Sequence, residues 1–90
     1  MKMVLNKSFG TFSLSSDACA ALNLSSPYDD IDRNDDKLVK VVSEMGPKAN
    51  GRSSILKVVE IPSNATDFMI NDYDGFETVI YVVDGKLHKI

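Results

Sequence analysis

The chain has no tryptophan, one cysteine (Cys19), one histidine (His88) and no long apolar run. A single cysteine excludes an internal disulfide and a cysteine-rich metal site. A transmembrane helix needs roughly 18 or more consecutive apolar residues, and the first ten residues lack the apolar stretch of a signal peptide. These absences predict a soluble, cytoplasmic protein without a membrane segment.

Clustered positive charge is also missing. The ten Lys and Arg residues are spread along the chain, and the formal net charge is −3. Affinity for a phosphate backbone comes from clustered Lys and Arg that displace counterions. We therefore expect no general nucleic-acid binding.

Only five glycines are present, and they are scattered, so no glycine-rich phosphate-binding loop is expected. Two of them form Asp74-Gly75 and Asp84-Gly85 within residues 67–90, where they separate three runs rich in β-branched and aromatic residues. Asp-Gly favours a type I′ turn, because both central residues need positive φ. The pattern predicts an antiparallel C-terminal meander.

Two helices are expected upstream of the meander. The first spans about 16–23, with Ser15 or Ser16 as its N-cap. The second begins after Asn34 as N-cap and ends at Gly46, and its apolar residues recur at i, i+3, i+4 and i+7. These residues are Leu38, Val41, Val42 and Met45.

Strands are predicted at 3–5, resuming after a bulge at Gly10, and at 54–61. The fold class is then α+β, a single domain over 1–90. We expect an antiparallel sheet of four to five strands with the C-terminal meander, and two helices packed on one face.

Short motifs spread over most of the chain resemble those of small uncharacterised bacteriophage and prophage proteins. They are KxFGxFxLS from Lys7, DRxD from Asp32, LV at 38–39, GxxANG from Gly46, LKVVEIP from Leu56 and IxDYDGxE from Ile70. The resemblance carries no known activity and no functional residues. It implies a phage accessory protein in the host bacterial cytosol, where such proteins often bind and block host proteins or capture host signals.

Acidic residues concentrate at Asp29, Asp30, Asp32, Asp35 and Asp36, with Arg33 expected to pair with one of them. The spacing does not match a calcium loop, because no Gly and no distal Glu follow, so no metal is expected. Two interpretations stay open. The cluster is either a solvated loop and helix start, or a contact for a basic partner surface.

A second acidic group, Asp72, Tyr73 and Glu77, surrounds the Asp74-Gly75 turn. Asp72 and Glu77 are expected to face each other near the turn or to lie on a shared sheet face, where like charges repel unless a cation or an Arg of a partner lies between them. This group is either an ordinary exposed hairpin or a partner contact.

Residues 78–83 are apolar on both faces of the predicted strand, which suits a strand covered on both sides. Such a strand is either central with partial cover or part of a protein interface. Thr78, Ile80 and Val82 are therefore candidates for a homodimer interface.

Thiol catalysis needs a base within reach and a residue that orients it, and nothing in the sequence brings Cys19 and His88 together. We expect Cys19 in the core, His88 exposed, no catalytic residues and no cofactor. The favoured function is non-enzymatic inhibition of a host protein, such as a component of CRISPR or another bacterial defence. The alternative is an oligomeric module that sequesters a small nucleotide-type ligand, and a small enzyme ranks third.

Overall fold

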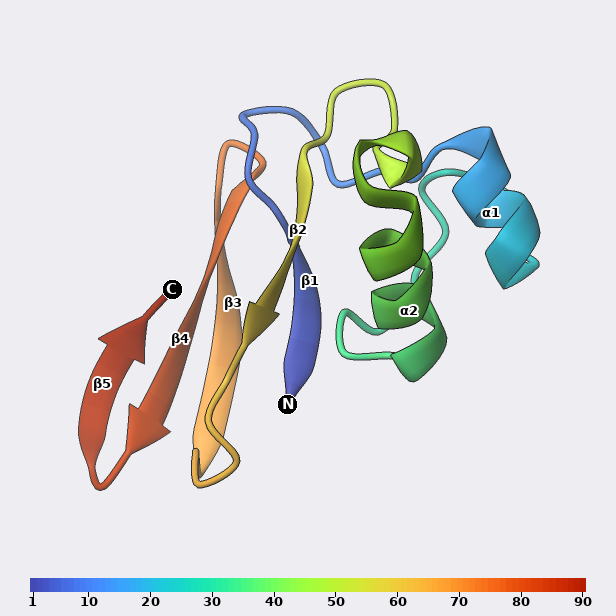
Figure 1. Cartoon of the computed structure of the whole chain (residues 1–90). Helices are drawn as coiled ribbons and strands as arrows, with labels where there is room; N and C mark the ends of the chain where they lie inside the picture. The colour runs from blue at the N-terminus through green and yellow to red at the C-terminus, as the bar shows by residue number, and fades with distance from the viewer.

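A computed structural model describes residues 1–90 and contains five strands and two α-helices (Figure 1). Their order is β1 (Lys2–Asn6), α1 (Ser16–Leu22), α2 (Asp36–Met45), a 3₁₀ helix η1 (Gly46–Ala49), β2 (Leu56–Glu60), β3 (Asp67–Tyr73), β4 (Phe76–Val83) and β5 (Lys86–Lys89). The predicted α+β class is confirmed. Neither helix is both long and apolar enough to cross a membrane.

The C-terminal meander is confirmed, with antiparallel strands in the order β3-β4-β5. Both turns have positive φ at two successive residues, 51° and 91° at Asp74-Gly75 and 52° and 75° at Asp84-Gly85. These values match the predicted type I′ geometry. The register pairs Asp72 directly with Glu77, as expected.

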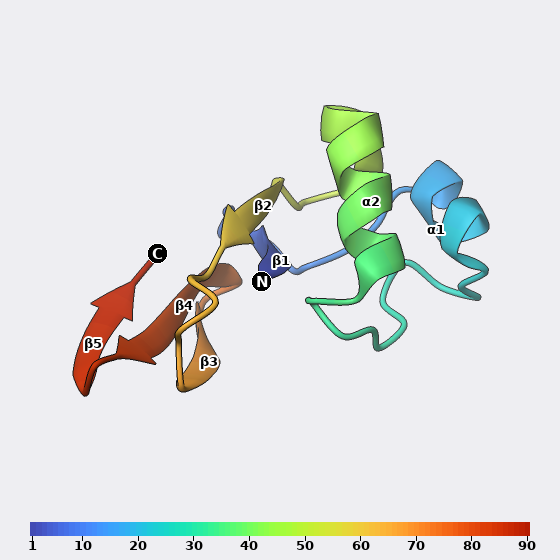
Figure 2. The same ribbon diagram turned by 60° about the horizontal axis from the view of Figure 1, so that its bottom comes forward.

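The five strands divide between two sheets, whereas the sequence predicted one. Strands β1 and β2 form a separate antiparallel pair, and Figure 2 shows this pair between the meander and the helices. The helices therefore pack against β1 and β2 and not against the meander. The reason is that β1 is apolar on both faces, so it can be covered on both.

Each face of β1 contributes to its own core. Met3 and Leu5 pack with Ile61 and Val79 on the meander side. Val4 packs on the helix side with seven other buried residues, namely Leu14, Ala18, Cys19, Leu38, Val42, Ala49 and Leu56. Cys19 is thus a buried core residue, as predicted.

Two local predictions need correction. The N-cap of α2 is Asp35 rather than Asn34, because the Asp35 carboxylate accepts hydrogen bonds from the backbone N–H groups of Lys37 and Leu38. No strand resumes after Gly10, and the chain there bends around the side chain of Asn6, which bonds the carbonyls of Ser8 and Gly10. This bend forms one wall of the candidate site.

Candidate functional site

The site is built around a buried ion pair between Arg33, in the loop before α2, and Glu77, on β4. The Glu77 side chain is 4% exposed and that of Arg33 21%. The contact is bidentate, with Arg33 Nη1 donating to Oε1 and Nη2 donating to Oε2, the latter at 2.8 Å. The predicted pairing of Arg33 with a neighbouring aspartate is therefore wrong.

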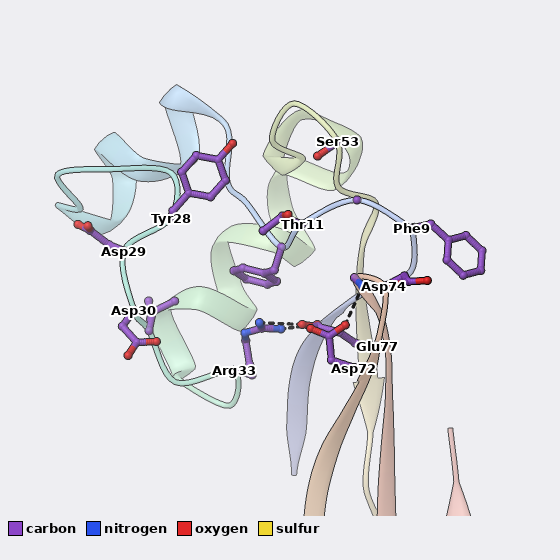
Figure 3. A pocket seen from close by; sticks show the side chains of 14 residues that line it. Phe9, Thr11, Tyr28, Asp29, Asp30, Arg33, Ser53, Asp72, Asp74 and Glu77 are labelled. Atoms are coloured by element: carbon purple, nitrogen blue, oxygen red, sulfur yellow. Dashed lines mark hydrogen bonds and ion pairs between the residues drawn. The ribbon is translucent and has the colours of Figure 1, made fainter.

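Two further contacts fix this ion pair, which Figure 3 shows with dashed lines. Glu77 Oε1 also accepts a hydrogen bond from the backbone N–H of Asn6 at 2.8 Å. The guanidinium of Arg33 lies 3.5 Å from the ring centroid of Phe12, a favourable cation–π contact. A single carboxylate thus joins β1, β4 and the loop before α2.

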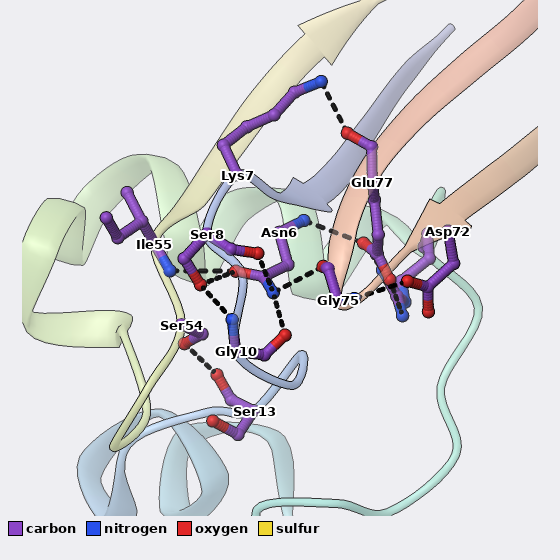
Figure 4. A network of polar contacts seen from close by, with 11 residues as sticks. Asn6, Lys7, Ser8, Gly10, Ser13, Ser54, Ile55, Asp72, Gly75 and Glu77 are labelled. Carbon is purple, nitrogen blue, oxygen red and sulfur yellow. Dashed lines mark hydrogen bonds and ion pairs between the residues drawn. The ribbon is translucent and has the colours of Figure 1, made fainter.

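Asn6 is the second organising side chain and is fully buried (Figure 4). Its Nδ2 donates to the carbonyl of Gly75 at 2.8 Å, and its Oδ1 accepts from the N–H of Ile55 at 2.9 Å. The β3-β4 turn is therefore tied to the end of β1 and to the start of β2. Gly75 is needed here, because a Cβ at this residue would lie 1.5 Å from the Gly10 carbonyl oxygen.

Lys7 ties the end of the chain to the same region. Its Nζ donates to the carbonyl of Glu77 at 2.6 Å and to that of Ile90 at 3.3 Å, and lies 5.1 Å from the Phe76 ring centroid. Burial lowers the pKa of Lys7; the negative charge of Glu77 opposes this shift and the positive charge of Lys89 adds to it.

Above the ion pair opens a cleft of about 400 Å³, which we call the acidic cleft. Four aspartates line it, and they come from two distant segments: Asp29 and Asp30 from the loop before α2, Asp72 and Asp74 from the β3-β4 hairpin. The aromatic side chains in its lining are Phe9, Phe12 and Tyr28. Figure 3 shows the loop and the turn on either side of the Arg33–Glu77 pair.

The chain supplies no cation for these four carboxylates. None of the three ion pairs in the structure involves them. Asp29 accepts two backbone hydrogen bonds, from Ser25 and Ser26, and Asp72 accepts one from Gly75. Arg33 is the only cation that lines the cleft, and its charge is already matched by Glu77. The cleft is therefore net negative.

Four of the other predicted contact residues lie outside the cleft, namely Asp32, Asp35, Asp36 and Tyr73. Asp35 caps α2 and Asp36 occupies its first turn, so both have a structural role in the helix start. Asp32 is exposed beside the cleft, and Tyr73 is 70% exposed without lining it. Glu77 is 3% exposed and internally paired, so it is not the exposed contact that the sequence suggested.

Thr78, Ile80 and Val82 lie on the opposite face of β4 from the buried Val79 and so do not belong to the cleft. Strand β4 is the central strand of its sheet, and a homodimer interface at these three residues stays a prediction.

Sequence reasoning missed Asn6, Phe12 and Tyr28. The available signal was a pair of aromatic residues, Phe9 and Phe12, in a segment rich in Gly, Ser and Thr, which favours an irregular backbone over a strand. Only the tertiary contacts reveal that this segment faces the acidic loop.

Thiol chemistry has no support in the geometry. Figure 1 places α1, which carries Cys19, and β5, which carries His88, at opposite ends of the molecule. Burial raises the pKa of the Cys19 thiol, with a further contribution from the charge of Asp29, which disfavours the nucleophilic thiolate. No group of three or more His, Cys, Asp or Glu residues is arranged to hold a metal ion.

The chain matches no protein-family model, no curated protein and no solved structure. Its function must therefore be argued from the cleft.

Proposed function

We propose that the protein is a non-enzymatic interaction protein that binds a basic surface of another protein through the acidic cleft and blocks that protein. The observation that carries the proposal is the convergence of two acidic segments on one cleft. Asp29 and Asp30 meet Asp72 and Asp74 there, and the only cation in the lining is already paired. Such a cluster of like charges is most stable when a partner supplies the opposite charge.

The chemistry of the lining favours an Arg or Lys side chain of the partner. The free carboxylate oxygens can accept charge-assisted hydrogen bonds, which are shorter and stronger than neutral ones. Tyr28, 62% exposed at the rim, offers an aromatic face for a cation. A rigid floor, made by Arg33 and Glu77, keeps the carboxylates in place before binding and so lowers the ordering cost.

The resemblance to small phage proteins supports the host bacterial cytosol as the place where this binding occurs. In the cytosol of a host bacterium, the partner is a host protein with a basic groove, and we favour a component of CRISPR or another defence system. Charge complementarity speeds the association of such a pair, and salt weakens it.

The acidic lining argues against the alternative of a nucleotide-binding module at this cleft. A nucleotide carries phosphate groups, and Asp29, Asp30, Asp72 and Asp74 would repel them. No observation on the cleft favours that alternative.

The test compares two charge-matched double variants in affinity capture from bacterial lysate with quantitative mass spectrometry. The cleft variant is Asp30→Lys with Asp74→Lys, and the control is Asp17→Lys with Asp36→Lys, two exposed residues in first helical turns outside the cleft. Both variants change the net charge by the same amount.

We expect to identify bacterial proteins that are captured by the wild type and by the control but not by the cleft variant. Binding of each purified candidate should then weaken by at least about tenfold in the cleft variant, and added salt should weaken the binding of the wild type and of the control. Equal capture by all three proteins, or loss in the control as well, would contradict the proposal. Circular dichroism and urea denaturation of both variants establish that they are folded.

A further inference from the structure

The meander has one covered face and one open face. Val79, fully buried, points from β4 toward Met3 and Leu5 of β1. Side chains alternate along a strand, so Ile80 and Val82 point the other way. The helices lie beyond β1 and β2, on the side away from the meander (Figures 1 and 2). No element of the chain covers the face that Ile80 and Val82 occupy.

The centre of this open face is apolar. The strand register places Met69 of β3 beside Ile80, and Leu87 of β5 beside Val82. Met69 is 61% exposed and Leu87 74% exposed. Three strands at their usual spacing and length give the whole open face an area of roughly 400 Å².

The two edges of the open face carry opposite charges. Asp67 begins β3 and pairs with Val82, so it lies on this face at one edge. Lys89, near the end of β5, pairs with Ile80 and lies on the same face at the other edge. An acidic edge, an apolar centre and a basic edge make a surface that is complementary to a second copy of itself.

We propose that a second copy of this chain docks on the open face, with a two-fold axis parallel to the strands. This axis places β3 of each copy over β5 of the other. Asp67 of one copy then lies one cross-strand row away from Lys89 of the second copy, as a diagonal neighbour. A two-fold axis perpendicular to the strands would instead set Lys89 against Lys89. The edge charges therefore select the parallel axis, an aligned packing of two sheets.

The size of the face sets the strength of the association. Two copies bury roughly 800 Å² in total, below the about 1,200 Å² of standard interfaces. A dissociation constant on the order of 10–100 µM is therefore expected, with exchange between monomer and dimer. The parallel axis also points both β3-β4 turns in the same direction, so the dimer has its two acidic clefts at one end.

Sedimentation equilibrium between about 5 and 500 µM tests the proposal with three surface variants. Met69→Lys and Ile80→Lys place a charge in the apolar centre and should raise the dissociation constant at least about tenfold. The matched control is Ile55→Lys, because Ile55 is 47% exposed and lies on none of the three strands of this face. It should leave the dimer unchanged.

A charge exchange tests the arrangement. Asp67→Lys alone and Lys89→Asp alone should each weaken the dimer, because each brings like charges together, and the double exchange should restore it. A monomer at 500 µM, or a dimer that Met69→Lys leaves intact, would overturn the proposal. Failure of the double exchange to restore the dimer would overturn the parallel axis. Loss of the dimer would leave the cleft of each monomer in place, so the outcome is separate from that of the cleft variants.

Discussion

The ion pair between Arg33 and Glu77 leads to an asymmetric prediction, because its two partners differ in exposure. The Glu77 side chain is 4% exposed and that of Arg33 21%. Arg33→Met leaves a carboxylate with almost no access to water and without its cation. Removing one partner of a buried pair typically costs 3–5 kcal/mol, and the partial exposure of Arg33 places this case at about 3 kcal/mol. The lost contact with Phe12 adds to the cost.

Glu77→Gln should cost less, about 1–2 kcal/mol. The amide oxygen can still accept the N–H of Asn6, and the guanidinium that remains is partly solvated and still lies over the Phe12 ring. The difference between the two variants depends on which group is left alone in the interior and on the Phe12 contact, which only Arg33→Met removes, so it tests the geometry more sharply than either value does.

Urea denaturation followed by far-UV circular dichroism measures both free energies of unfolding, with an unchanged m-value as the sign that only stability differs. Arg52→Met is the control, because Arg52 is exposed and forms no ion pair, and it should stay within about 0.5 kcal/mol of the wild type. A cost for Arg33→Met below that of Glu77→Gln would refute the reasoning.

Three other outcomes are expected in the same unfolding assay. Gly75→Ala should lower the free energy of unfolding several times more than Gly85→Ala does. Both glycines have positive φ, but the new Cβ would meet the Gly10 carbonyl only at Gly75, whereas Gly85 has open space around it. Equal losses in the two variants would contradict this contact. Asn6→Asp should cost about 3 kcal/mol or more, because a carboxylate cannot replace the Nδ2 donor to the carbonyl of Gly75; a neutral effect would show that the hydrogen-bond network is dispensable. The raised pKa of Cys19 means that its thiol ionises first in the unfolded chain, so its contribution to the free energy of unfolding is present below pH 9.0 and declines above it. Cys19→Ala should flatten that decline, and identical plots of stability against pH for the wild type and the variant above pH 9.0 would contradict the prediction.

Local signals predicted the elements of the fold because those elements depend on nearby residues. Asp74-Gly75 and Asp84-Gly85 specify their turns through positive φ, which any chain with these residues favours. Ser15 caps α1 through its own hydroxyl, and the apolar period of 3.6 residues places Leu38 in the core. The one-residue error at the N-cap of α2 arose because Asn34 and Asp35 are both good caps.

The candidate site was predicted only in pieces. Both acidic groups were found, but their convergence depends on contacts between residues more than 40 positions apart, such as Arg33 with Glu77. The buried position of Glu77 also escaped prediction, because a glutamate two residues after a turn is usually exposed.

The sequence by itself determined the α+β class, the C-terminal meander, the two helices and the polarity of each strand face, since all of these follow from backbone geometry and side-chain period. Only the tertiary structure decided that β1 and β2 separate from the meander, that Arg33 leaves the acidic loop to pair with Glu77, and that two acidic segments border one cleft. The physical reason is that β1 has two apolar faces and Glu77 one buried charge. Several distant segments could cover the faces of β1, and several cations could neutralise Glu77. The choice among them depends on the packing of the whole chain.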